Sequence, residues 1–143
     1  MTQDTIRLLR ECDAGVKMGI SSFEDVLGHV QNRILKNLME TCKAEHEKLH
    51  EEIQSLLSRH GEEGKEIHPM AKGMSHIKTN MKLAMEGNDG TVADMIIDGC
   101  NMGVKSLSRY LNQYKAASPE VRAMAKRLIR LEEDLATDIR PFL

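Results

Sequence analysis

Residues 33–60, RILKNLMETCKAEHEKLHEEIQSLLSRH, form the stretch that decides the fold, because it has no Pro or Gly and consists mostly of helix-favouring residues. Its inward positions recur at steps of three or four, the spacing of an amphipathic helix packed in a bundle. These positions are Leu35, Leu38, Cys42, His46, Leu49, Ile53 and Leu56. Gly61 follows as a C-cap. The stretch therefore predicts one long helix over residues 33–60.

The same periodicity predicts three more long helices, over residues 4–28, 91–115 and 119–142. A shorter helix is expected over residues 69–86, because Pro69 suits a first helical turn and the following GNDG is a strong turn signal. No strand pattern competes with these helices.

Loop lengths indicate the topology. The links between the first two long helices and between the last two are short, so each pair is expected to form an antiparallel hairpin. Residues 61–90 separate the hairpins and contain the shorter helix, which can carry the chain along the bundle. We therefore expect a single all-α domain over residues 1–143, a four-helix bundle of two antiparallel hairpins joined by a long crossover.

The composition argues against several classes of partner and site. The net charge of -2 and the 3% aromatic content give no reason to expect a nucleic acid or an anionic membrane as partner. Cys12, Cys42 and Cys100 form neither a disulfide framework nor a CxxC motif. The N-terminus is charged, and no apolar run approaches the ~18 residues of a membrane span. A reducing cytoplasm is the expected location.

One short motif suggests a metal. Glu47-Lys48-Leu49-His50 matches the Glu-x-x-His pattern by which helical bundles hold iron. A helix turns by about 100° per residue, which puts His50 about 60° from the inward direction and Glu47 more than about 100° from it. Glu47 is therefore expected in solvent, and the motif is not expected to form a ligand pair.

Four other side chains are expected near the same level of the bundle, one from each long helix: Asp13, His46, Cys100 and Glu132. One interpretation is a buried hydrogen-bonded cluster in which Asp13 pairs with His46. The other is a single zinc or iron ion held by Asp13, His46, Glu132, and Cys100 or His50. A two-iron site needs more carboxylates than these positions supply.

A short internal echo accompanies this layout, since CDAGVK at 12–17 recurs as CNMGVK at 100–105. Together with the hairpins and MKLAMEGND at 81–89, it resembles the uncharacterised bacterial ferritin-like four-helix-bundle proteins, which are similar in length. The resemblance implies inward Glu and Glu-x-x-His metal ligands. This chain departs from that pattern: Asp13 is the only inward carboxylate of its helix, Cys100 stands on the third long helix, and the fourth lacks a His. The implied metal site is degraded.

These observations predict a non-enzymatic helical bundle without a cofactor that acts through protein–protein contacts, as a homodimer or as a stress-related interaction module. Val26, Leu83 and Met85 are spare apolar residues that could form the contact strip. The alternative is a metal-binding protein with a reduced mononuclear site for one iron or zinc ion, with a redox or sensor role.

Overall fold

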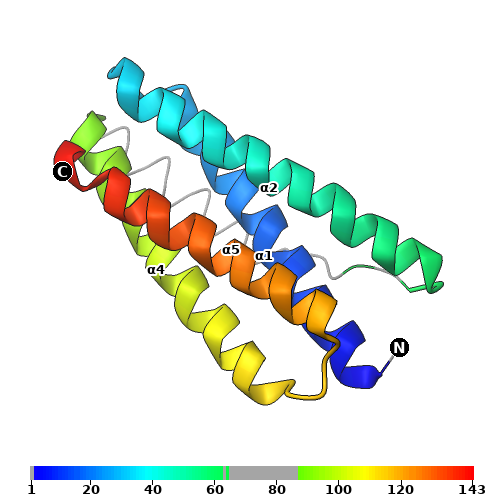
Figure 1. Ribbon diagram of the computed structural model, residues 1–143. Helices are drawn as coiled ribbons and strands as arrows, with labels where there is room; N and C mark the ends of the chain where they lie inside the picture. Colours follow the sequence, from blue (N-terminus) through cyan, green and yellow to red (C-terminus); the bar gives the residue numbers. More distant parts are fainter. Residues whose placement is uncertain (1, 63, 65–86) are drawn as a thin grey trace.

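The computed structural model describes residues 2–62, 64 and 87–143. These residues form α1 (Gln3–Leu27), α2 (Arg33–Arg59), α4 (Asp89–Gln113) and α5 (Pro119–Asp138), and the short 3-10 helix η1 (Arg140–Phe142) follows. The described residues contain no strand. The prediction of an all-α four-helix bundle is confirmed, whereas the helix predicted over residues 69–86 lies outside the described residues (Figure 1).

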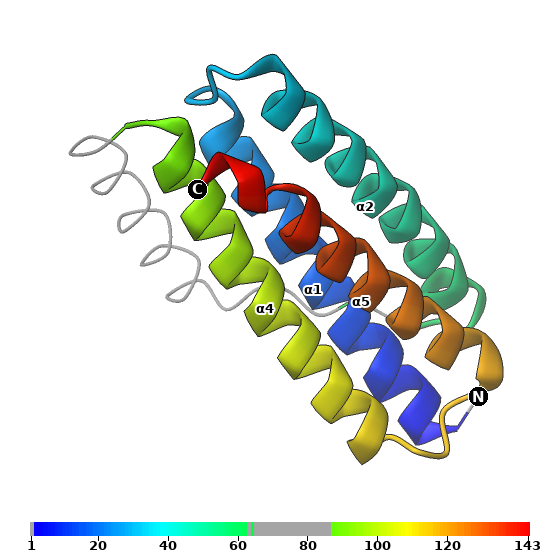
Figure 2. The same ribbon diagram turned by 60° about the vertical axis from the view of Figure 1, so that its left-hand side comes forward.

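Two antiparallel hairpins, α1–α2 and α4–α5, build the bundle (Figures 1 and 2). α2 and α4 run in the same direction on opposite sides of the bundle, and α1 and α5 lie between them. This is the arrangement that a long connection between the hairpins was predicted to produce.

Each long helix begins at a side chain that caps it. The side-chain oxygens of Thr2, Asn32, Asn88 and Ser118 accept hydrogen bonds from backbone N–H groups of the first turns that follow. Pro119 occupies the first position of α5, where its missing N–H costs nothing. Local sequence therefore sets all four starting points.

The helix ends are also set locally. Gly61 has φ +67°, and the N–H groups of Gly61 and Glu62 bond the carbonyls of Ser58 and Leu57, which closes α2 as its sequence predicted. α5 was expected to reach residue 142 but ends at Asp138, and η1 follows. Pro141 explains the difference, because it lacks an N–H and disfavours the α conformation of the residue before it.

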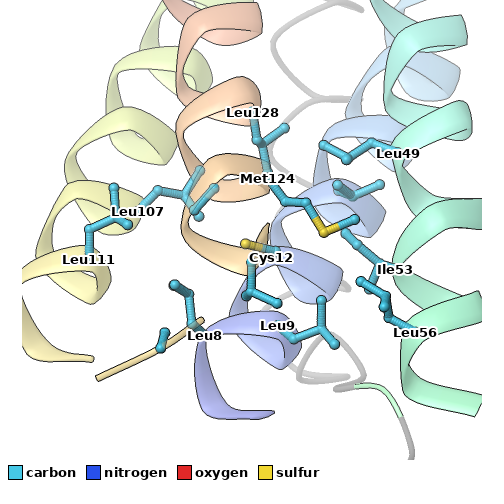
Figure 3. Packing of buried hydrophobic residues seen from close by; sticks show 14 of the residues in the cluster. Leu8, Leu9, Cys12, Leu49, Ile53, Leu56, Leu107, Leu111, Met124 and Leu128 are labelled. Atoms are coloured by element: carbon cyan, nitrogen blue, oxygen red, sulfur yellow. The ribbon is translucent and has the colours of Figure 1, made fainter. Parts of the chain in front are cut away.

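The core consists of two apolar clusters, one towards each end of the bundle. The first, shown in Figure 3, includes Leu8, Leu9, Cys12, Leu49, Ile53, Leu56, Leu107, Leu111, Met124 and Leu128. The second includes Phe23, Val26, Val30, Leu35, Met39, Cys42, Val92, Ile96, Cys100, Leu135 and Ile139. Every long helix contributes to both clusters, and each fully buried Leu or Ile contributes about 1.5–3 kcal/mol.

Val26 was expected at the surface and is instead buried in the second cluster. Phe23 and Val26 of α1 and Val30 of the following loop face inward, whereas residue spacing alone favours Leu27 in place of Val26. Both choices obey steps of three and four, and packing against α2 decides between them. The predicted contact strip therefore loses Val26, and its other members, Leu83 and Met85, lie outside the described residues. Among the described helices, none is long and apolar enough to cross a membrane.

Each hairpin loop is held by the first helix of the other hairpin. The Asp89 carboxylate at the start of α4 accepts the N–H groups of Gln31 and Asn32 at 2.8 and 2.9 Å. At the opposite end, the Thr5 hydroxyl accepts the N–H of Ser118 at 2.8 Å. These contacts fix the position of one hairpin relative to the other along the bundle axis.

Asp89→Ala is expected to lower the free energy of unfolding by about 1–2 kcal/mol, because two backbone N–H groups lose a charged acceptor. Urea denaturation followed by circular dichroism measures the change. Asp98→Ala on the same helix is the control and should change the free energy by less than about 0.5 kcal/mol, since Asp98 is exposed. Equal effects of the two substitutions would contradict the proposed clamp.

Candidate functional site

A buried histidine faces a buried glutamate at the level where the two apolar clusters meet. His46 on α2 is 1% exposed and Glu132 on α5 is 8% exposed. The His46 Nε2 and Glu132 Oε1 atoms lie 3.8 Å apart. The His46 Nδ1–H donates to the Cys42 carbonyl at 2.8 Å, which orients the ring so that Nε2 points towards Glu132. The pair therefore links the two hairpins through their second helices.

Glycines on the other two helices make room for this pair. A Cβ atom at Gly19 of α1 would lie 2.8 Å from Cδ2 of His46. A Cβ atom at Gly103 of α4 would overlap the Glu132 carboxylate. Phe23 of α1 also packs edge-on against the His46 ring, with centroids 5.4 Å apart. All four long helices thus shape one small site.

Opposite charges on His46 and Glu132 stabilise each other. Burial lowers the pKa of His46, but its polar contacts with Cys42 and Glu132 outweigh burial and raise the pKa from 6.5 to about 10. Burial raises the pKa of Glu132, while the nearby His46 opposes this. Neither His46 Nε2 nor Glu132 Oε2 has a hydrogen-bond partner among the described residues. An imidazolium and a carboxylate therefore compensate each other in an apolar interior.

Asp13 belongs to a separate polar group in the same bundle. Its carboxylate is fully buried, accepts a hydrogen bond from Gln54 Nε2 at 2.7 Å, and pairs with Lys17 Nζ at 2.9 Å. The His50 Nε2 atom lies 3.6 Å from it. The predicted pairing of Asp13 with His46 is wrong, because Asp13 lies at the level of the first cluster, beside a later part of α2.

Four of the five predicted metal ligands therefore form two pairs, Asp13 with His50 and His46 with Glu132, and Cys100 is the fifth. Cys100 is buried on α4, where burial, followed by the charges of Glu132 and Cys42, raises its pKa to about 12. Zinc and iron sites commonly use three or four protein ligands. Among the described residues, no three His, Cys, Asp or Glu side chains are grouped so that they could hold an ion. The present arrangement does not fit the implied metal.

The two side chains of the Glu-x-x-His motif point in different directions, as their helical phase predicted. Glu47 is exposed and lies 3.7 Å from Lys43 Nζ, whereas His50 is half-buried. The motif does not bring two ligands together.

A surface groove between α2 and α5 was not predicted from the sequence. It has a volume of about 340 Å³, and Leu38, Cys42, Leu131 and Leu135 give it an apolar floor. Ile34, 64% exposed, lies on its edge. The signal available in the sequence was Ile34, an apolar residue on the outward side of a helix whose seam includes Leu35.

Three carboxylates complete the edge of this groove: Glu45, Asp134 and Asp138. No Lys or Arg is among its lining residues. Among the described residues, Asp134 and Asp138 make no ion pair, and Glu45 lies 3.6 Å from the exposed Lys48 ammonium. The groove is therefore apolar inside and acidic at its edge.

Comparison with known proteins gives one match. A family model described as a domain of unknown function, DUF2383, matches residues 4–113. The matched region includes His46 and Gly103 and ends before α5, which supplies Glu132. No curated protein and no solved structure matches the chain.

Gly103→Ala is expected to destabilise the protein relative to Gly99→Ala. Replacing a helical Gly with Ala commonly gains about 0.4–1 kcal/mol, and position 99 has open space for the new methyl group. At position 103 the methyl group would displace the buried Glu132 carboxylate from His46. Thermal and urea denaturation of both variants checks this. Equal stabilisation by the two substitutions would contradict the packing of Glu132 against Gly103.

The free energy of unfolding is expected to fall as pH rises from 6.5 to 9. Because the folded-state pKa of His46 is about 10 and its ordinary value is 6.5, its contribution is complete below pH 6.5 and is lost progressively up to about pH 10. The slope should approach about 1.4 kcal/mol per pH unit, the value for one proton.

Urea denaturation at several pH values measures this slope, and His46→Gln is the control that should flatten it. The range stops at pH 9 because Cys12 and Cys100, with pKa values raised from 9.0 to about 12, contribute above it. The same slope in both proteins would show that His46 is neutral when folded.

Proposed function

The chain belongs to the DUF2383 family of domains of unknown function, and we propose that it acts as a non-enzymatic helical bundle through protein–protein contacts, with a second copy of itself as the partner. We also propose a ferritin-like relationship for the fold, supported by two antiparallel hairpins with a long connection between them. The contact surface is the α2–α5 groove.

The exposed Ile34 side chain carries this proposal. It is one of three large hydrophobic residues that are exposed among the described residues, together with Met102 and Leu143. Ile34 alone of the three lies beside an apolar groove. Ile34 and the groove lie side by side on one face of the protein. A two-fold axis through that face would therefore let each copy insert its Ile34 side chain into the groove of the other.

Charges on this face are complementary. Arg33 and Lys36 flank Ile34, are exposed, and make no ion pair with a described residue. The carboxylates of Asp134 and Asp138 on the groove are equally unpaired within the described part of the chain. In a two-fold contact the basic residues of one copy would approach the acidic edge of the other, which favours a second copy as the occupant.

The alternative function, binding of one iron or zinc ion, has less support. His46 Nε2 and Glu132 Oε2 are buried polar atoms without a hydrogen-bond partner among the described residues, as ligands would be. They provide two donors, fewer than such ions commonly take from a protein. Elemental analysis of untagged protein tests this alternative. A stoichiometric metal that disappears in His46→Gln would favour it.

Ile34→Ser is expected to raise the dimer dissociation constant at least about tenfold, since burial of an Ile side chain contributes about 1.5–3 kcal/mol. Sedimentation equilibrium over a concentration series measures the constant. Met102→Ser is the matched control on α4, 71% exposed and not among the groove-lining residues, and it should leave the constant unchanged. A wild-type protein that stays monomeric at all concentrations would overturn the proposal.

A charge-reversal cycle tests the orientation of the contact. Arg33→Glu and Asp138→Lys should each weaken association, because each places like charges opposite one another. The double variant should recover most of the lost affinity. Additive weakening in the double variant would place these residues apart in the dimer.

A further inference from the structure

We infer that Cys42 is a modification site for small uncharged electrophiles that enter through the α2–α5 groove, with His46 and Glu132 as positioning residues behind the thiol. The three side chains form a row from the groove into the core. Cys42 Sγ lies 3.7 Å from His46 Nδ1, and His46 Nε2 lies 3.8 Å from Glu132 Oε1. The chain has three cysteines, and this one combines a route from solvent with a neighbouring cation.

Access distinguishes Cys42 from the other thiols. All three cysteines are buried, Cys42 at 7%, Cys100 at 6% and Cys12 at 0% exposure, but Cys42 alone of the three lines the groove. The volume of about 340 Å³ lies at the lower end of the range for pockets that hold small molecules. A small apolar reagent can therefore reach the Cys42 sulfur with little rearrangement.

His46 supplies the chemical activation. The thiolate is the reactive form of cysteine, and an adjacent imidazolium stabilises it. Contacts with Cys42 and Glu132 outweigh burial and keep the proton on His46, whose pKa is raised to about 10. Burial, with the charges of nearby acidic groups, raises the pKa values of Cys12 and Cys100 to about 12, so these thiols stay protonated and inert.

Other groups around Cys42 set selectivity. Its thiol also faces the Leu131 carbonyl of α5 at 4.0 Å. α1 places Gly19 and Phe23, which carry no charge, beside His46, and α4 contributes the Cys100 thiol.

The groove edge adds the carboxylates of Glu45, Asp134 and Asp138. These negative charges repel anionic reagents. The site therefore favours uncharged electrophiles over anionic ones.

For an α,β-unsaturated carbonyl compound the reaction is a redox-neutral addition. The thiol proton passes to water in the groove, and the thiolate forms a carbon–sulfur bond at the β carbon. The π electrons of the carbon–carbon double bond move towards the carbonyl oxygen to give an enolate. The enolate then takes a proton from water at the α carbon, so that no atom or electron is left over.

This chemistry does not require the proposed dimer, but the dimer gives it a consequence. An adduct on Cys42 would occupy the groove that receives Ile34 of the second copy. Where the proposed function holds, modification therefore dissociates the dimer and becomes a means of regulation.

The test uses the full chain and N-ethylmaleimide, an uncharged α,β-unsaturated carbonyl reagent, with peptide mapping by mass spectrometry. In Ile34→Ser, whose groove stays open, Cys42 should react at least tenfold faster than Cys12 or Cys100. Equal rates at the three cysteines would overturn the inference. Faster reaction in Ile34→Ser than in the wild type indicates a covered groove. Equal rates at Cys42 in these two proteins would count against the dimer and leave the thiol site standing.

Two substitutions separate activation from simple exposure. At one fixed pH, His46→Gln should slow Cys42 modification at least about threefold relative to modification of Cys100 in the same protein, and Glu132→Gln should slow it by less. Unchanged relative rates in both variants would overturn the role of His46, and the second variant serves if the first does not fold. Iodoacetamide should also outpace iodoacetate at Cys42 by a larger factor than at a cysteine in a short peptide. The same factor in both would overturn the charge selectivity.

Discussion

The His46 imidazole and the Glu132 carboxylate face each other at 3.8 Å between the two apolar clusters, and burial makes each depend on the other. A lone buried charge at this level would be costly, and an opposite charge beside it offsets that cost. The pair joins α2 to α5, so it sets the register between two hairpins that are not adjacent in sequence. The same constraint explains why glycine occupies positions 19 and 103, since a side chain at either position would take the space of the pair.

The same pair connects the interior to the surface. Cys42 contacts His46 on its inner side and forms part of the groove floor on its outer side. Ile34 and the acidic side chains at the groove edge lie on that outer face, where we propose that a second copy docks. A proton on His46 therefore influences both the stability of the bundle and the reactivity of the thiol that the dimer would cover. Asp13 has no part in this connection, because Gln54, Lys17 and His50 surround it in a separate group.

Most of the fold could be predicted from residue spacing, because helical period, caps and loop lengths are local properties. The steps in α2 identified Cys42, His46 and Leu49 as buried, and the phase of Glu47 showed that it faces solvent. Spacing could not choose between Val26 and Leu27, since both satisfy the period and packing against another helix decides. It also could not assign Asp13 to Gln54 instead of His46, because a shift of one or two turns between helices changes every cross-helix contact. The groove was missed for the same reason, as it exists only once α2 and α5 are placed side by side.

The most direct test of this account is the protonation state of His46 in the folded protein. Nitrogen-15 NMR of selectively labelled histidine reports whether one or both ring nitrogens carry a proton, and His46→Gln identifies the signal. We predict that both His46 nitrogens stay protonated from pH 6.5 to pH 9. A His46 ring that is neutral at pH 7.5 would contradict the charged pair and the thiol activation that depends on it.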